Sequence, residues 1–232
     1  MNLGDYKTLV FDCDGVVLDS NRIKTEAFRL AAQPYGSAAA EALVAYHVAN
    51  GGISRYAKFA YFFDELLPEH ASGTEGPGID ELLASFADCV RAGLETCQVA
   101  EELENLRATT ENARWLIVSG GDQSELRSIF KTRGLAELFD GGIFGSPDTK
   151  QDILNREIDS GSIENPALFL GDSKLDHLAA SACNLDFLFV SKWTEFSDWR
   201  TYCARHHLSS ISEIAQLLPA VAKQASGRHR PG

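Results

Sequence analysis

Short apolar runs that alternate with helical patterns limit the possible folds of this chain more than any other feature. Each run has the length of a buried strand and is bounded by turn-forming residues. The four clearest runs are Thr8–Phe11, Trp115–Val118, Ala167–Leu170 and Phe187–Val190, and Gly142–Phe144 is a weaker fifth. Apolar residues at helical spacing follow the second run, at Leu126, Ile129 and Phe130. This alternation predicts an α/β fold, a doubly wound parallel sheet with helices on both faces.

Residues 20–95 do not follow this alternation. Apolar stripes at Ile23–Ala31 and Tyr56–Leu67 predict two amphipathic helices, and a third is expected near Glu81–Leu94. No convincing strand lies among them, so we expect a helical insert after the first strand. The predicted parts are a core domain of residues 1–19 and 96–222, an inserted helical cap domain of residues 20–95 and a disordered tail of residues 223–232.

The charge balance limits the possible partners. Among 232 residues, 33 acidic and 21 basic side chains give a net charge of −12. At long range this charge repels nucleic acid and anionic membranes, so neither is an expected partner. A small anionic substrate stays possible, because nearby cations or a metal outweigh a distant field that salt screens.

The cysteine pattern and the N-terminal residues bear on location. Five scattered cysteines without a Cys-x-x-Cys pair favour free thiols over disulfides or a zinc site. The N-terminal residues lack the basic region and apolar run of a signal peptide, and no run approaches the roughly 20 apolar residues of a membrane span. We therefore expect a cytoplasmic protein, and the sequence leaves open whether it is a monomer or a homodimer.

Polar residues follow the predicted strands at the points where they end. Asp12 and Asp14 follow the first strand, Ser119 follows the second, and Asp172 follows the strand that ends at Leu170. Because ligands of open parallel sheets bind beyond the carboxyl ends of the strands, these side chains are expected to converge. The sequence therefore predicts a functional site at this edge of the sheet.

Each of these residues also has a purely structural interpretation. An Asp beside a Gly is commonly a turn or capping residue, and this applies to Asp12 and Asp14. Ser119 before two glycines is typical of a helix N-cap, Lys150 of a solvated surface lysine, and "GDSKLD" of a capped helix start. The occurrence of all of them, in order, at strand ends favours a functional site.

Taken together, the motifs "DCDGV", Ser119, Lys150 in "GSPDTK", and "GDSKLD" resemble the four motifs of the haloacid dehalogenase-like phosphohydrolase superfamily. The helical insert resembles the alpha-helical cap of that family, and the closest subgroup is the beta-phosphoglucomutase-like sugar-phosphatase branch. The resemblance covers Tyr6 to about Val190. It implies a Rossmann-like core and phosphoryl transfer, and Asp14 disfavours a chlorine-removing dehalogenase.

The resemblance implies a role for each acid of the first motif. Asp12 would be the nucleophile that forms an aspartyl-phosphate, because an ionised carboxylate can attack phosphorus. Asp14 would be the general acid and base, and burial under the cap is expected to raise its pKa. Gly15 would permit the tight turn that lets both acids face one reaction centre.

The resemblance also implies a magnesium site and a phosphate site. Asp12, Asp172 and the backbone carbonyl of Asp14 resemble the Mg²⁺ ligands, since oxygen ligands suit this ion. Asp176 would orient either the metal site or Lys150. The phosphoryl oxygens would be held by Ser119, Gly120 and Lys150.

The cap is expected to select the substrate. The segment Asn50–Lys58 resembles the part of the family's cap that faces the active site, so Arg55 and Lys58 are candidates to bind the far end of the substrate. The alternative is a helix N-cap at Ser54 followed by two solvated cations. Tyr56, Phe59 and Phe63 are interpreted as cap core, His47 receives no role, and Asp19 and Ser20 are interpreted as hinge residues.

The predicted function is a Mg²⁺-dependent phosphatase that hydrolyses a small phosphorylated metabolite, a sugar phosphate by resemblance. A phosphosugar mutase of the beta-phosphoglucomutase type is the first alternative, because the same acids would serve it. A non-catalytic binding protein on this fold is the second. A metal-dependent glycosyltransferase, which "DCD" alone would suggest, leaves Ser119 and Lys150 unexplained.

Overall fold

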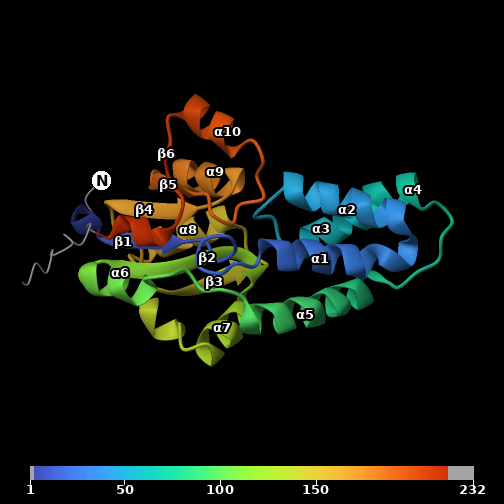
Figure 1. The fold of residues 1–232 in the computed structure, drawn as a ribbon, viewed down its shortest axis with the longest axis horizontal. Coiled ribbons are helices and arrows are strands. Elements are labelled where there is room, and N and C mark those ends of the chain that lie inside the picture. The colour runs from blue at the N-terminus through green and yellow to red at the C-terminus, as the bar shows by residue number, and fades with distance from the viewer. Residues whose placement is uncertain (1–2, 219–232) are drawn as a thin grey trace, which may run out of the picture.

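Six strands form one parallel sheet within residues 3–218, the part of the chain that this computed structural model describes. The strands are β1 (Thr8–Phe11), β2 (Arg114–Asp122), β3 (Gly142–Ser146), β4 (Ala167–Gly171), β5 (Asp186–Val190) and β6 (Ser209–Ile211). Their order across the sheet is β3-β2-β1-β4-β5-β6, and every neighbouring pair is parallel (Figure 1). The predicted doubly wound α/β fold is therefore confirmed, whereas the predicted tail at residues 223–232 lies outside the described residues.

The predicted strands are all present, with two differences. β2 continues past its predicted end at Val118 as far as Asp122, so Ser119 and Gly120 belong to the last part of the strand. β6 was not predicted, because its sequence, "SSI", is short and mostly polar.

Side chains of the central strands alternate between two hydrophobic cores. In β1, Leu9 and Phe11 contribute to one core and Val10 contributes to the other. The first core includes residues of α6 (Leu103–Thr109) and α7 (Gln123–Thr132), and the second includes residues of α8 (Lys150–Asp159) and α9 (Lys174–Ala182). Because both faces are covered, each strand is a nearly continuous apolar run.

The last described helix, α10 (Trp199–His206), follows β5. The Trp199 ring stacks on Phe189 of β5 with 5.4 Å between ring centroids. Short 3₁₀ turns occupy Leu3–Asp5, Ala136–Leu138 and Ile214–Leu217.

The helices of the insert lie together beyond the end of the sheet where β1 stops (Figure 1). They are α1 (Asn21–Ala32), α2 (Ser37–Ala49), α3 (Arg55–Tyr61), α4 (Leu67–His70) and α5 (Ile79–Thr96), with a 3₁₀ turn at Gln33–Tyr35 and a π-helical turn at Phe62–Leu66. α2 was not predicted, because its alanine-rich sequence has no apolar stripe. The domain boundaries at 19/20 and 95/96 stay a prediction.

Aromatic rings form the centre of the insert. Phe28 of α1 packs against Phe86 of α5 and Phe59 of α3, with centroid distances of 4.3 Å and 5.2 Å. The interpretation of Phe59 as cap core is therefore right, and the partly buried Phe63 packs against the same cluster. For Tyr56 it is wrong, because this side chain is 39% exposed and donates a hydrogen bond to Asp122.

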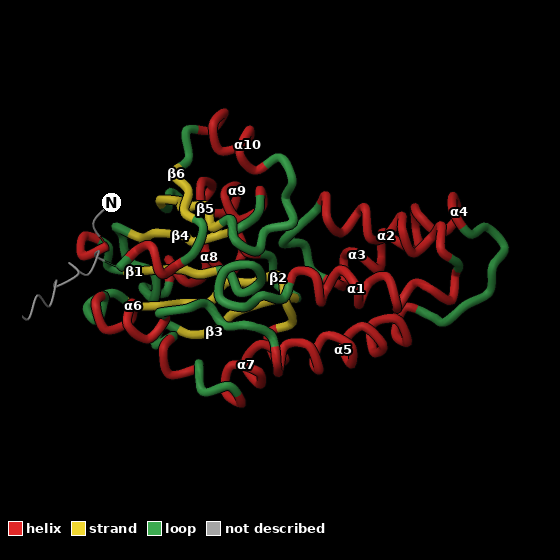
Figure 2. Tube along the Cα trace, viewed as in Figure 1, coloured by secondary structure: helices red, strands yellow, loops and turns green. Residues whose placement is uncertain are grey.

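Two chain segments connect the sheet to the insert, and they run side by side. Figure 2 draws both as loops, the first between β1 and α1 and the second between α5 and α6. The backbone N–H of Asp19 donates to the carbonyl of Gln98 (2.9 Å), and the N–H of Ala100 donates to the carbonyl of Val17 (2.8 Å). Backbone hydrogen bonds therefore hold the two connections side by side.

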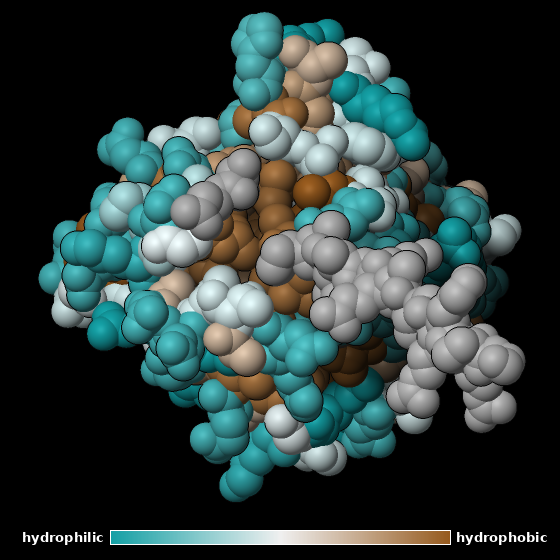
Figure 3. Space-filling model, turned by 60° about the vertical axis from the view of Figure 1, so that its left-hand side comes forward, coloured by the Kyte–Doolittle hydropathy of each residue, from teal (hydrophilic) through white to brown (hydrophobic). Residues whose placement is uncertain are grey.

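The end of the molecule away from the insert comes forward in Figure 3. Hydrophilic side chains cover most of this face, and hydrophobic ones form a band across its middle. No helix within residues 3–218 is both long enough and apolar enough to cross a membrane.

Candidate active site

The end of β1 places two acids in one tight turn. Asp12 is buried, its backbone N–H donates to the carbonyl of Leu170 in β4 (2.9 Å), and its Oδ1 accepts from the N–H of Cys13 (2.7 Å). Gly15 has a φ of +76°, a backbone conformation that favours glycine. A Cβ at Gly15 would also overlap Oδ2 of Asp172. Glycine is therefore needed both for the turn and for the close approach of the two strand ends.

Asp176 and Lys150 tie the end of β4 to the end of β1. Asp176 is fully buried in α9, and its Oδ2 accepts hydrogen bonds from the backbone N–H groups of Asp172 (3.2 Å) and Ser173 (3.0 Å). Lys150, the first residue of α8, has its Nζ 2.5 Å from Oδ1 of Asp176 and 2.8 Å from Oδ2 of Asp12. Because Lys150 is buried between two carboxylates, its interpretation as a solvated lysine is wrong.

Three carboxylates gather at this point with too little positive charge to balance them. Asp12, Asp172 and Asp176 each offer an oxygen, and these atoms lie within 4.8 Å of one another. Burial, reinforced by Asp176, raises the pKa of Asp12 to about 7 against the opposing effect of Lys150. Burial and the charge of Asp12 also raise the pKa of Asp172 well above its usual range. Closely spaced hard oxygen donors with uncompensated negative charge fit a divalent cation such as Mg²⁺.

The two oxygens of Asp176 are already engaged by Lys150 and by the start of α9, in agreement with an orienting role. Asp12 and Asp172 line the active-site cavity and Asp176 does not, so Asp12 and Asp172 are the carboxylates best placed to ligate a metal.

Asp14 has the opposite charge environment. Its Oδ2 lies 2.5 Å from Nζ of Lys24 in α1, and its Oδ1 accepts a hydrogen bond from the hydroxyl of Ser20 (2.5 Å). Burial raises the pKa of Asp14, but Lys24, the hydroxyl of Ser20 and the charge of Lys150 together more than offset burial, so the pKa lies below its usual value. The predicted rise in this pKa was wrong, because it counted burial and not the lysine of the first cap helix.

The end of β2 meets the cap directly. Ser119 is fully buried, and its hydroxyl accepts a hydrogen bond from the N–H of Gly121 (3.0 Å). The N-cap of α7 is Asp122, so the N-cap interpretation of Ser119 is wrong. A Cβ at Gly120 would overlap the carbonyl oxygen of Gly52 in the cap. Gly120 therefore permits the close approach of the cap to the sheet edge.

Besides Lys24, the cap contributes two cations from α3, and neither is solvated. Ser54 is the N-cap of α3, as the alternative interpretation expected, but Arg55 and Lys58 behind it are buried. Arg55 forms an ion pair with Glu125 of α7. Lys58 places its Nζ 2.6 Å from Nδ1 of His47 in α2. The two side chains therefore have different neighbours despite their similar sequence positions.

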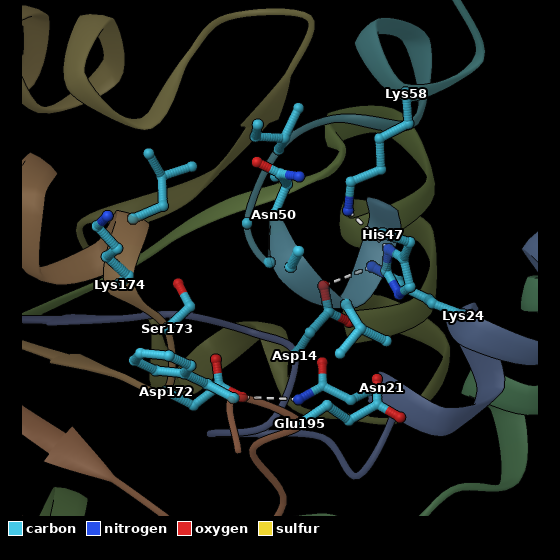
Figure 4. Close-up of a pocket in the computed structure, with 18 of the residues that line it drawn as sticks. Asp14, Asn21, Lys24, His47, Asn50, Lys58, Asp172, Ser173, Lys174 and Glu195 are labelled. Atoms are coloured by element: carbon cyan, nitrogen blue, oxygen red, sulfur yellow. Dashed lines mark hydrogen bonds and ion pairs between the residues drawn. The ribbon is translucent and has the colours of Figure 1, made fainter. Parts of the chain in front are cut away.

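A cavity of about 270 Å³ lies between the cap and the strand ends (Figure 4). Of the predicted site residues, those that line it are Asp12, Asp14, Gly120 and Asp172 from the sheet edge and Arg55 and Lys58 from the cap. Lys150, Asp176 and Ser119 are not among the lining residues. The structure thus brings all the predicted residues to one region but gives only some of them a surface in the cavity.

Sequence reasoning missed several residues of the site. Asn21 donates to Oδ2 of Asp172 (2.7 Å), and Lys24 pairs with Asp14. Their spacing, three residues apart on the first predicted helix, places them on one helical face and is a signal that could have found them. His47 had no such signal, because its contact with Lys58 depends on how α2 packs against α3.

The chain is similar to known proteins in sequence pattern. The profile of a family described as haloacid dehalogenase-like hydrolase matches residues 6–184. A search of curated proteins finds no match to this sequence.

The fold is similar to solved structures over most of the chain. A predicted phosphatase from Clostridium acetobutylicum has 17% sequence identity and a TM-score of 0.67, covering 91% of this chain and 96% of its own. The HAD-type protein YfnB from Bacillus subtilis, solved bound to magnesium, has 20% identity and a TM-score of 0.62 over 91% and 96% of the two chains. A predicted phosphoglycolate phosphatase from Haemophilus somnus has 17% identity and a TM-score of 0.62 over 93% and 92%. At identities this low, the likeness is one of fold.

Proposed function

The chain belongs to the haloacid dehalogenase-like hydrolase family, and from this premise we propose that it is a phosphatase. Its substrate would be a small phosphorylated metabolite, hydrolysed through an aspartyl-phosphate on Asp12. The observation that carries this proposal is the buried group of Asp12, Asp172 and Asp176 with Lys150, at the edge of a small cavity. Such a group has the charge and the hard oxygen donors that phosphoryl transfer requires.

In the first step, a carboxylate oxygen of Asp12 attacks phosphorus and the bond to the substrate oxygen breaks. Lys150 lies 2.8 Å from Asp12, so it is placed to balance charge where the phosphoryl group arrives. Burial lowers the pKa of Lys150, but Asp12 and Asp176 more than offset this, so the ammonium stays protonated. Ser119 and Gly120 complete the proposed phosphate site from the end of β2.

In the second step, water attacks the phosphorus of the aspartyl-phosphate and releases inorganic phosphate. Asp14 accepts the proton of that water, and the lowered pKa that Lys24 gives it favours the ionised form needed for this step. As general acid in the first step, Asp14 must carry a proton, so its contact with Lys24 has to weaken when the substrate enters.

We propose Mg²⁺ as the cofactor. Asp12, Asp172 and the backbone carbonyl of Asp14 would hold it, and Asn21 would orient Asp172 through their hydrogen bond. When bound, the ion supplies charge neutralisation for the transferring phosphoryl group.

The cavity volume supports a small substrate, because about 270 Å³ lies just below the range of roughly 300–1,000 Å³ for ligand pockets. A sugar phosphate is the substrate that the sequence motifs favour. A phosphosugar mutase remains the alternative function, in which the phosphoryl group on Asp12 returns to the sugar.

A phosphorus NMR time course with sugar phosphates and Mg²⁺ tests the proposal. We expect inorganic phosphate to accumulate in proportion to enzyme. Conversion of a sugar 1-phosphate to a 6-phosphate without phosphate release would establish the mutase instead. Turnover no greater than that of Asp12→Asn across a broad set of phosphate monoesters would favour a non-catalytic protein.

A further inference from the structure

Lys58 is a buried lysine whose amine lies at the active-site cavity. It is 2% exposed, lines the cavity from α3, and has its Nζ 5.4 Å from the ring centroid of Phe28. Figure 4 shows Lys58 and His47 reaching into the pocket from the cap, across from Asp172. Lys58 therefore reaches the cavity from the cap side, opposite Asp172 at the sheet edge.

Lys58 differs from the other buried cations in lacking an acidic partner. Within the described residues, the buried cationic side chains are Lys24, Arg55, Lys58 and Lys150. Lys24 pairs with Asp14, Arg55 with Glu125, and Lys150 with both Asp12 and Asp176. Lys58 has no carboxylate within ion-pair distance, and its recorded hydrogen-bond partner is the ring nitrogen of His47.

The contact with His47 leaves much of the amine unsatisfied. A lysine ammonium has three N–H donors, and His47 accepts one of them. Burial and the nearby charge of Lys58 lower the pKa of His47 to about 2, so its ring is neutral and acts as an acceptor. Because burying a cation without a counter-charge costs free energy, an anion at this end of the cavity would be strongly favoured.

We infer that Lys58, positioned by His47, binds a second acidic group of the substrate, at the end remote from the phosphoryl group that Asp12 receives. This inference rests on the proposed phosphatase function and narrows its substrate class. The second group is a carboxylate or a second phosphate, since either offers oxygens to the two remaining donors. A sugar monophosphate without a second acidic group would leave Lys58 unpaired.

A matched pair of substrates tests whether Lys58 binds a carboxylate. 3-Phosphoglycerate and glycerol 3-phosphate share a carbon skeleton and differ in a carboxylate against a hydroxymethyl group. We expect kcat/KM for 3-phosphoglycerate to be higher by about 10- to 100-fold, the range of a hydrogen bond to a charged group. A comparison of fructose 1,6-bisphosphate with fructose 1-phosphate tests in the same way whether Lys58 binds a second phosphate.

The variant Lys58→Met distinguishes a role in substrate binding from a role in packing, because methionine fills a similar volume without charge. We expect the preference for the acidic member of the pair to disappear in Lys58→Met, because the loss in kcat/KM is larger for 3-phosphoglycerate than for glycerol 3-phosphate. Removing an unpaired buried charge also leaves the thermal unfolding midpoint unchanged or raises it. Lys58→Arg should retain part of the preference, and Lys131→Met, on the exposed face of α7, should retain all of it.

Three results would overturn the inference: equal kcat/KM for both members of each pair in the wild type, an equal loss for both members in Lys58→Met, or a lowered unfolding midpoint with the preference intact. Failure of the phosphatase proposal looks different, because then no monoester releases phosphate. In that case calorimetric titration of 3-phosphoglycerate and glycerol 3-phosphate into the wild type and Lys58→Met decides the inference. The inference is supported if the wild type binds 3-phosphoglycerate more tightly than glycerol 3-phosphate and Lys58→Met does not. It is refuted if the wild type binds both compounds equally.

Discussion

Two aspartates that are two residues apart are held in opposite electrostatic states. Asp12 has acidic neighbours at the end of β4, and burial and Asp176 raise its pKa to about 7. Asp14 lies beside Lys24, which lowers its pKa despite burial. The same residue type thus receives different protonation behaviour from the elements that contact it. The raised pKa falls on Asp12, which must be ionised to attack phosphorus, so a cation beside Asp12, as proposed for Mg²⁺, is needed to lower this pKa.

At the residue scale, Asp12→Asn should lower phosphate release by about 10⁴-fold or more, because loss of a nucleophile removes the covalent route. The side chain keeps its size, so the circular dichroism spectrum and thermal midpoint should stay close to those of the wild type. Asp159→Asn, at the exposed end of α8, is the matched control and should be fully active. Substantial turnover by Asp12→Asn would refute the nucleophile assignment.

The amine of Lys58 gives a pH dependence of substrate preference. Burial and the charges of Lys24 and Lys150 lower its pKa to about 7, against the opposing effects of Asp14 and Glu195. The side chain is therefore charged below about pH 7 and neutral above it, and neutral His47 does not titrate in this range.

We accordingly expect the ratio of kcat/KM for 3-phosphoglycerate to that for glycerol 3-phosphate to fall as pH rises through about 7. The ratio cancels ionisations that both substrates share, including those of the acids and the phosphate. Initial rates between about pH 6 and about pH 9 measure it, and the ratio should be flat in Lys58→Met. A pH-independent ratio in the wild type would contradict the prediction.

At the scale of elements, the end of β2 and the cap approach each other at a glycine. A Cβ at Gly120 would overlap the carbonyl oxygen of Gly52, so Gly120→Ala must push the cap away from the sheet edge. We expect a loss of roughly 100-fold in kcat/KM, since a displacement of about 1 Å can cost that much. The thermal midpoint should change little, because neither hydrophobic core is altered.

Gly134→Ala is the control for Gly120→Ala with respect to activity. Gly134 has open space around its Cβ position but a φ of +70°, so alanine there strains the backbone without displacing the cap. It should lower stability slightly and leave kcat/KM unchanged. Equal activity losses in the two variants would show that the effect of Gly120→Ala does not come from the cap.

The sequence predicted the elements that end at the site better than the contacts made across it. Asp12 and Asp172 follow β1 and β4, and Ser119 lies in the last part of β2. Both β2 and β4 pair in parallel with β1, and parallel pairing brings such ends together. The Lys24–Asp14 and His47–Lys58 contacts depend on how helices of the insert pack, and α2 itself has no apolar stripe. Helical spacing places Lys24 on the same face as Asn21, but it does not show which acid Lys24 contacts. The His47–Lys58 contact has no such signal and depends on tertiary packing alone.

At the scale of the whole molecule, metal binding should be measurable apart from turnover. Mg²⁺ would relieve the repulsion between Asp12 and Asp172, so it should stabilise the folded chain. At about 100 times the dissociation constant, we expect the thermal midpoint to rise by roughly 5–10 °C over its value in EDTA. Phosphate release should cease in EDTA and return with Mg²⁺.

Asp172→Asn should lose most of this thermal shift, because it removes one proposed ligand. Asp148→Asn, an exposed acid outside the cluster, should keep it. Full activity in EDTA would refute the metal site, whereas a thermal shift without activity would leave the metal site standing and count against the phosphatase.

The two hydrogen-bonded connections between the sheet and the insert have a consequence for how such a protein can change during evolution. Because Asp19 bonds to Gln98 and Ala100 bonds to Val17, the chain leaves the sheet and returns to it at almost the same place. The helical segment between them can therefore be exchanged for another, or lengthened, while the strand register stays fixed. The part that selects the substrate can thus change during evolution while Asp12, Asp14 and Asp172 keep their places, provided that the new segment supplies groups equivalent to Asn21 and Lys24.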